Sequence, residues 1–259
     1  MIAVRLPVAG IDVALRTPTG AEDILLSEAG RQDVGVGLAL LRRLASRADG
    51  EPIDWDRVAL TDVDALLLRL RQHLLGDLVR ADTTCPAPDC RAPVDIAFSI
   101  GDYLAHHQPR AVTGYGTPNA EGWFQLPSGA AQFRVPRAVD QIAIGREARP
   151  DSALRRLCIR PADASAAARR SAETAMEAIA PNLCADLEGT CPECGATVVC
   201  RFDPLHYTLR ELTAQASLVY DEICAIARHT HWSEADIVAL PTARRVRYAE
   251  IATRHGGDS

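Results

Sequence analysis

Two pairs of cysteines are the residues of this 259-residue sequence best suited to chemistry. They lie in the turn sequences Thr-Cys-Pro-Ala-Pro-Asp-Cys and Thr-Cys-Pro-Glu-Cys-Gly, about a hundred residues apart. Two thiolates on one tight turn point to the same side, which makes half of a tetrahedral zinc site. The two turns together predict one Zn²⁺ site, whose ligands are Cys85, Cys90, Cys191 and Cys194.

Such a site would be structural, because four thiolates leave no coordination position open for a substrate. An alternative site draws all its ligands from the second half of the chain: Cys184, Cys191, Cys194 and Cys200. The remaining cysteines, Cys158 and Cys224, fall on the apolar stripes of predicted helices and are expected in the core.

Composition narrows the classes of function. The net charge of −6 makes general nucleic-acid binding improbable, because affinity for phosphate comes mainly from Lys and Arg. A run of 18 apolar residues and a signal peptide are both missing, which predicts a protein of the bacterial cytoplasm without membrane insertion. Nucleophile-elbow, Walker and dinucleotide-binding motifs are also missing, so we expect no enzyme, no catalytic residue and no small-molecule substrate. A redox role for Cys191 and Cys194 fits poorly, because Gly195 and a strand follow where a helix is usual.

The elements that position the cysteines follow from periodicity and punctuation. A strand is expected on each side of both cysteine turns. The helix before the first turn carries a leucine stripe; Thr61 with Asp64 resembles a capping box at its start, and Gly76 marks its end. Other expected elements are a hairpin of Ile2–Leu6 with Asp12–Arg16, helices 22–31, 34–47 and 164–179, and a short helix capped by Ser99.

The order of these signals repeats along the chain. Leu6-Pro7 is echoed by Leu126-Pro127, and a Cys-Pro turn followed by an apolar strand occurs once in each half. We therefore expect an internal duplication, with halves 1–108 and 122–204 joined by a Gly- and Pro-rich linker, 109–121. The predicted fold class is α+β: helix-rich, internally duplicated, with small β-hairpins around a zinc-ribbon-like four-cysteine site and a C-terminal helical tail.

The tail, residues 205–259, is predicted to be a helical docking arm. One long helix is expected from Leu205 to His229, then a short helix capped by Ser233, then a last helix opened by Pro241. Aromatic and basic side chains suited to an acidic protein partner gather in the last two helices. The candidate partner-binding residues are Trp232, Arg244, Arg245, Arg247 and Tyr248.

Two stretches resemble a known family. The run Asp62–Arg71, followed by Gly76–Val79, the first Cys-Pro turn and Val94–Ile96, is similar to the T4-like phage baseplate protein family. The run His231–Pro241, followed by Arg244, Arg245 and Tyr248, resembles a short module of phage tails and contractile injection systems.

This resemblance implies a structural or assembly role in a contractile tail baseplate, with hub, spike, tube or wedge proteins as partners and no catalysis. It also implies that the protein can be incorporated in a phage-tail-like particle. The alternative from a different class is a zinc-ribbon adaptor that binds nucleic acid or acts in regulation.

Overall fold

The computed structural model describes the backbone of residues 1–256 and the side chains of residues 1–254. Contacts between residues divide the chain into two compact units. Unit 1 contains Met1–Val4, Asp12–Ile53 and the chain from Leu205 onward, and unit 2 contains Arg5–Ile11 and Asp54–Pro204. Helices and small antiparallel sheets make up both units, so the prediction of a mixed α and β fold is confirmed.

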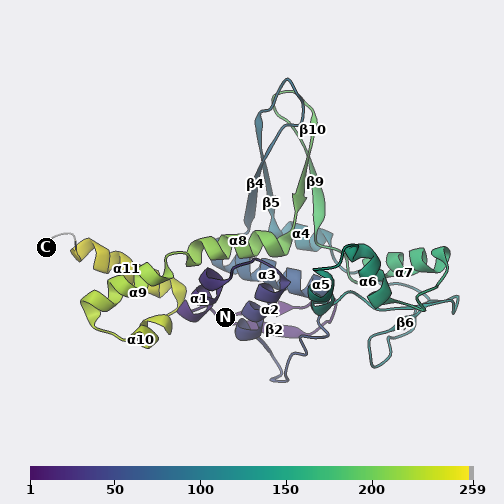
Figure 1. Ribbon diagram of the computed structural model, residues 1–259, viewed down its shortest axis with the longest axis horizontal. Coiled ribbons are helices and arrows are strands. Elements are labelled where there is room, and N and C mark those ends of the chain that lie inside the picture. Colours follow the sequence, from purple (N-terminus) through teal and green to yellow (C-terminus); the bar gives the residue numbers. More distant parts are fainter. Residues whose placement is uncertain (257–259) are drawn as a thin grey trace. The chain divides into compact units, whose positions relative to one another are not determined.

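Unit 1 is built around a three-stranded sheet of order β1-β2-β3 (Figure 1). Its elements are β1 (Ile2–Arg5), β2 (Asp12–Leu15), α1 (Gly20–Glu28), α2 (Val34–Leu44), β3 (Ala45–Arg47), α8 (Pro204–Ala216), α9 (Val219–Thr230), α10 (Glu234–Val238) and α11 (Thr242–Gly256).

Unit 2 contains a second three-stranded sheet, of order β6-β7-β8, and two separate hairpins, β4-β5 and β9-β10. Its elements are α3 (Leu60–Leu75), β4 (Leu78–Thr84), β5 (Pro93–Ser99), α4 (Ile100–His106), β6 (Phe124–Gln125), β7 (Gln132–Phe133), α5 (Ala138–Ile144), α6 (Pro150–Cys158), β8 (Ile159–Arg160), α7 (Ala166–Ile179), β9 (Ala185–Thr190) and β10 (Thr197–Phe202).

Several helix ends follow the sequence signals. Gly76 ends α3 at a φ of 91°, where a side chain would be strained. Ser99 caps α4 by accepting from the Asp102 N–H, and Ser233 caps α10 by accepting from the Asp236 N–H.

The predicted capping box of α3 is wrong. The helix begins at Leu60, with Ala59 as a cap that makes no side-chain hydrogen bond. The Thr61 hydroxyl donates instead to the Pro181 carbonyl, 2.9 Å away, and Asp64 is buried inside the unit. Tertiary contacts thus use the polar side chains that the sequence pattern assigned to the cap.

Two predicted helices also differ in extent. The expected helix from Leu205 to His229 is two helices, α8 and α9, interrupted at residues 217–218. The expected helix 34–47 ends at Leu44, because Ala45–Arg47 pair with β2 as strand β3.

The same order of elements occurs twice. The first segment, β1 to α4, runs strand, strand, helix, helix, strand, helix, strand, strand, helix, and the second segment, β6 to α8, runs in the same order. The sheets β1-β2-β3 and β6-β7-β8 share one topology. Their registers also correspond, since Leu15 pairs with Ala45 in the first and Phe133 pairs with Ile159 in the second.

The two segments also share an arginine–carboxylate pair at the start of their first helix. Arg16 at the end of β2 binds Glu22 in α1 at 2.7 Å, and Arg134 after β7 binds Asp140 in α5 at 2.6 Å. Each carboxylate is the third residue of its helix and also accepts from the cap backbone N–H, at Thr19 or Arg137. Both helices therefore begin with the same arrangement, a carboxylate that binds an arginine and the backbone N–H of the cap residue.

Aromatic side chains in unit 2 join the bases of the two hairpins. Phe98 of β5 lies 5.0 Å from Phe202 of β10 between ring centroids, and Tyr103 of α4 lies 5.2 Å from each of them. The Tyr103 hydroxyl donates to the Leu183 carbonyl just before β9, at 2.6 Å. These contacts hold the hairpins side by side, with their cysteine-bearing turns at the far end (Figure 1).

The C-terminal helices pack within unit 1. Contacts group the predicted arm, 205–259, with residues 12–53, and α11 packs against α9 and α1. The arm is therefore an integral part of this unit. No helix among the residues described is both long and apolar enough to cross a membrane.

Candidate metal centre

The two cysteine turns share one backbone pattern. Each first cysteine closes its turn by donating its N–H to the carbonyl just before the return strand: Cys85 to Ala92 and Cys191 to Ala196, both at 2.9 Å. Near the end of each turn one residue has a positive φ, which is 52° at Arg91 and 75° at Gly195. Gly195 tolerates this conformation at no steric cost.

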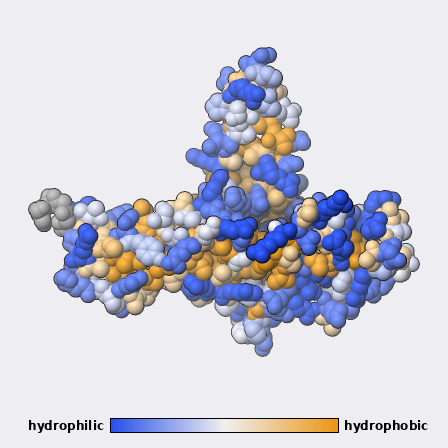
Figure 2. All heavy atoms as spheres, in the orientation of Figure 1, coloured by the Kyte–Doolittle hydropathy of each residue, from blue (hydrophilic) through white to orange (hydrophobic). Residues whose placement is uncertain are grey.

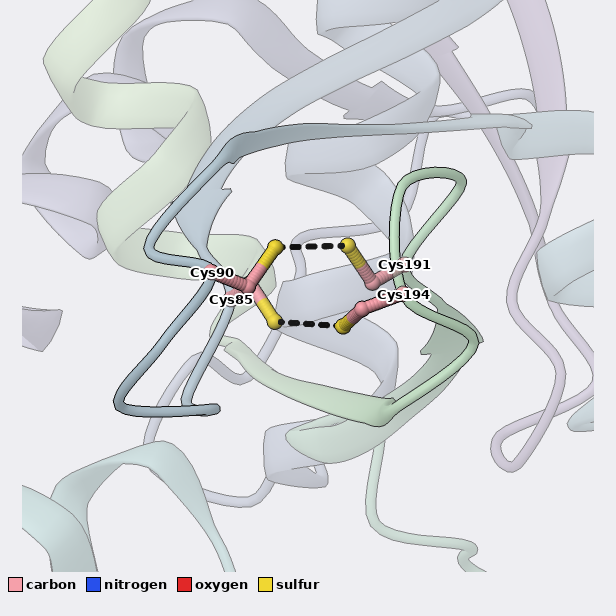
Figure 3. A group of neighbouring side chains, drawn as sticks. All are labelled: Cys85, Cys90, Cys191 and Cys194. Carbon is pink, nitrogen blue, oxygen red and sulfur yellow. Dashed lines mark hydrogen bonds between the residues drawn. The ribbon is translucent and has the colours of Figure 1, made fainter.

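The two turns bring their sulfur atoms together. The Cys85 and Cys194 Sγ atoms are 3.5 Å apart, the Cys90 and Cys191 Sγ atoms are 3.8 Å apart, and all four lie within 4.8 Å of one another (Figure 3). A tetrahedral zinc with Zn–S bonds of about 2.3 Å has sulfur–sulfur edges of about 3.8 Å. The donor set and its spacing therefore fit one four-coordinate metal ion.

The thiols lie in a shell of small apolar side chains. Cys85 and Cys191 are buried, Cys90 is half-buried and Cys194 is exposed. The residues packed around them are Val94, Val198, Ala87, Ala92 and Ala196. Such a shell excludes water from the inner thiols without offering a further ligand.

Backbone N–H groups act on the thiols in both turns. The N–H groups of Cys194 and Glu193 point at the Cys191 sulfur and lower its pKa to about 7. The N–H of Ala87 likewise lowers the pKa of Cys85, but burial and the neighbouring thiols outweigh it and raise this pKa to about 12. Backbone N–H groups thus favour the thiolate form of Cys191.

The cysteines are not joined by disulfides. All eight are free, and a sulfur–sulfur distance of 3.5 Å is far longer than the bond length of about 2.05 Å. Among the described residues, the cluster able to hold a metal consists of the four predicted ligands, Cys85, Cys90, Cys191 and Cys194.

The alternative ligands lie elsewhere on the second hairpin. Cys200 is within β10, opposite Leu187 of β9, and Cys184 comes just before β9 beside Arg201. Neither joins the cluster. Cys158 is buried, as predicted, and burial raises its pKa to about 12. Cys224 is exposed on α9, so its predicted place in the core is wrong.

The predicted partner-binding residues separate into two groups. Trp232 is exposed and Tyr248 is half-buried; their ring centroids are 5.4 Å apart, and the Arg244 guanidinium lies 5.6 Å from the Tyr248 ring. Arg247 is exposed on α11 and pairs with Glu250 at 2.9 Å.

Arg245 is a correction to the prediction. Its side chain is 0% exposed, and it binds Asp23 at 2.8 Å and Glu222 at 2.7 Å. An arginine held between two carboxylates inside unit 1 does not face a partner protein.

Two buried carboxyl groups in α3 had no functional signal in the sequence. Asp62 accepts from the Val8 and Ala9 N–H groups at 2.8 and 3.0 Å, yet burial raises its pKa to about 6. Burial and the charge of Asp203 raise the pKa of Asp64 well above its usual range, and the Asp64 Oδ1 atom has no hydrogen-bond partner among the described residues.

Comparisons with known proteins found no relative of this chain. No protein-family model, no curated protein and no solved structure matches the chain.

Proposed function

We propose that this protein is a non-catalytic structural or assembly component of a contractile tail baseplate, of a phage or a contractile injection system, clipped by one structural zinc ion. The observation that supports the zinc site is the convergence of four thiols from two turns that lie far apart in the sequence. The resemblance of Asp62–Arg71 and His231–Pro241 to baseplate proteins supports the assembly role.

The donor set favours zinc. Four sulfur ligands in a tetrahedron suit Zn²⁺ or an iron site, and a closed set of this kind serves structure. Binding would contribute folding free energy on the order of 10 kcal/mol. Because the ligands lie on two hairpins, the ion would fix the direction of one hairpin tip relative to the other.

We also infer that the two segments arose by internal duplication. Support comes from the shared element order, the corresponding sheet registers and the paired carboxylates Glu22 and Asp140. Zinc would then join equivalent turns of the two segments, in the manner of a zinc ribbon.

A protein partner suits the outer surface of the hairpins better than a nucleic acid does. Hydrophilic residues cover much of the hairpin pair on the face seen in Figure 2. The exposed acidic residues near the turns are Asp82, Asp89, Asp95, Glu188 and Glu193. Acidic side chains repel phosphate, so this surface favours a basic protein face.

Two measurements test the metal site. Elemental analysis of the purified chain should find one zinc per chain, and a chelator should release that zinc together with about four reactive thiols. Finding iron instead would change the identity of the proposed ion. A chain that is folded but holds no metal would contradict the proposed structural metal site.

The baseplate role needs its own experiment. Deleting the gene from a strain that makes contractile particles should leave sheath and tube proteins unassembled, as seen by electron microscopy, and the wild-type gene should restore the particles. Normal particles in the deletion strain would contradict the role. Salt-sensitive DNA binding by the purified chain would favour the nucleic-acid adaptor instead.

A further inference from the structure

Two helix starts in this protein dock through the same pair of backbone hydrogen bonds. In unit 2 the start of α3 lies against the start of α5. The Leu60 N–H donates to the Pro136 carbonyl at 3.0 Å, and the Ala138 N–H donates to the Val58 carbonyl at 3.3 Å. A helix start thus binds a short edge, Pro136–Gln141, which we call the α5 edge.

In unit 1 the start of α11 lies in the same way against the start of α1. The Thr242 N–H donates to the Pro18 carbonyl at 3.2 Å, and the Gly20 N–H donates to the Leu240 carbonyl at 3.3 Å. The approach is close, since a Cβ on Gly20 would lie 2.9 Å from the Val238 Cα. Pro18–Asp23, the α1 edge, is thus occupied by α11.

The fourth residue of each helix distinguishes the two docked pairs. In α11 it is Arg245, which binds Asp23, the fourth residue of α1. In α3 it is the apolar Val63, fully buried, and the fourth residue of α5 is Gln141, which is exposed. The α1 edge therefore presents two carboxylates, of Asp23 and Glu222, to the fourth residue of the helix that docks on it, and an arginine suits that position.

The start of α7 has this arginine, but among the described residues it makes no such pair of backbone hydrogen bonds with another helix start. By order of elements α7 corresponds to α3, and both begin beside the hairpin turn of their own segment: Asp62 accepts from Val8, and Ala168 packs in one cluster with Leu126. The fourth residue of α7 is Arg169, as in α11 and unlike α3.

Exposure and hydrogen bonding agree that the α7 start is undocked. Ser165, Ala166 and Ala167 are exposed, whereas Ala59 is buried at the docked start of α3. The Ala164 carbonyl, two residues before the helix like those of Val58 and Leu240, accepts from the chain's own Arg169 at 2.7 Å.

We propose that the start of α7 (Ala164–Arg169) docks on the α1 edge of a second copy of this chain, in the place held by α11. Arg169 then takes the position of Arg245, beside Asp23 and Glu222. Helix α3 of the first segment docks on the α5 edge, which belongs to the second segment. By the same rule, α7 of the second segment docks on the α1 edge of another chain. Helices α10 and α11 act as a cap on the free edge, as terminal repeats do in repeat proteins. This proposal does not depend on the metal site.

The first test opens the cap in the full-length chain. Arg245→Glu places a third carboxylate beside Asp23 and Glu222, so α11 should leave the α1 edge and the chain should form concentration-dependent oligomers in sedimentation velocity. Adding Arg169→Glu should weaken this association about tenfold or more, because it removes the arginine that fills the vacated position. Adding Arg170→Glu, an equal change of charge at the exposed neighbour, should leave association unchanged.

A folded Arg245→Glu chain that stays monomeric, or one whose association ignores Arg169→Glu, would overturn the proposal. Should Arg245→Glu fail to fold, the milder Arg245→Gln decides, because it also weakens the hold of α11 on Asp23 and Glu222 and so uncovers the α1 edge. A photo-crosslinking amino acid at position 166 should yield a dimer cross-linked to the peptide containing Pro18–Asp23. Arg169→Glu should remove that dimer and Arg170→Glu should keep it, whereas no dimer, or cross-links elsewhere, would count against docking.

Discussion

Replacing Arg245 with methionine should lower the unfolding free energy of unit 1 far more than the same change at other arginines of α11. The guanidinium is completely buried and binds Asp23 at 2.8 Å and Glu222 at 2.7 Å. Methionine retains much of the volume of the side chain but leaves two buried carboxylates without a cation. Breaking a buried pair in this way costs about 3–5 kcal/mol.

The matched control is Arg247→Met on the same helix. Arg247 and Glu250 pair at 2.9 Å with side chains 66% and 54% exposed, so this change should cost only about 0.5 kcal/mol. Urea unfolding followed by circular dichroism measures both, and at about 2 kcal/mol per M the Arg245 variant should lose about 2 M in midpoint.

A rescue variant identifies the cause. If uncompensated charge is responsible, adding Asp23→Asn and Glu222→Gln to Arg245→Met should recover most of the lost stability, because a neutral triad has no buried charge. Equal midpoints for the Arg245 and Arg247 variants would refute the assignment of Arg245 to the interior, and failure of the rescue would point to lost packing instead.

Three further predictions concern the metal site, the pH dependence and the docking surface. Cys194→Ser should lower zinc content and make the chain protease-sensitive while Cys200→Ser leaves both unchanged, as measured by elemental analysis and limited proteolysis; equal zinc retention would contradict the ligand assignment. Asp62 has a folded pKa of about 6 against the usual 3.8, so its protonated form favours the folded state below pH 4 and this stability is lost as the pH rises through 6. The unfolding free energy of wild type minus that of Asp62→Asn should therefore fall by about 2.5 kcal/mol between pH 4 and pH 7.5, and a constant difference would contradict the shift. Trp232→Ala should weaken binding of a baseplate partner by about 2 kcal/mol or more while Leu218→Ala, at a still more exposed apolar side chain, does not, as measured by calorimetry; equal losses would argue against a Trp232 surface.

The four clustered cysteines could be predicted from sequence because the signal of each turn is local. A Cys-Pro turn between two apolar strands sets the direction of its own thiols, whatever the rest of the chain does. The hairpin strands and the end of α3 at Gly76 were predictable for the same reason.

Other features depend on partners far along the chain. Arg245 lies among exposed arginines in sequence, and only the approach of Asp23 and Glu222 makes it an interior residue. Strand β3 is three residues long and exists because Val13–Leu15 supply its hydrogen bonds. The break between α8 and α9 contains neither Gly nor Pro, so no punctuation marked it. Long-range contacts decided the position of Arg245 and the formation of β3 against the local pattern.

The sulfur pairs have a consequence for synthesis of the protein. Cys85 pairs with a residue 109 positions later and Cys90 with one 101 positions later. At about 5–20 residues per second, the first two thiols leave the ribosome roughly 5–20 s before their counterparts. Throughout that interval the nascent chain carries only half of the proposed ligand set, so binding of one metal ion by all four thiols must wait for the second turn. If the site holds zinc, as proposed, chains made in a cell short of zinc would have both hairpins in contact at their bases but no ion joining the two turns.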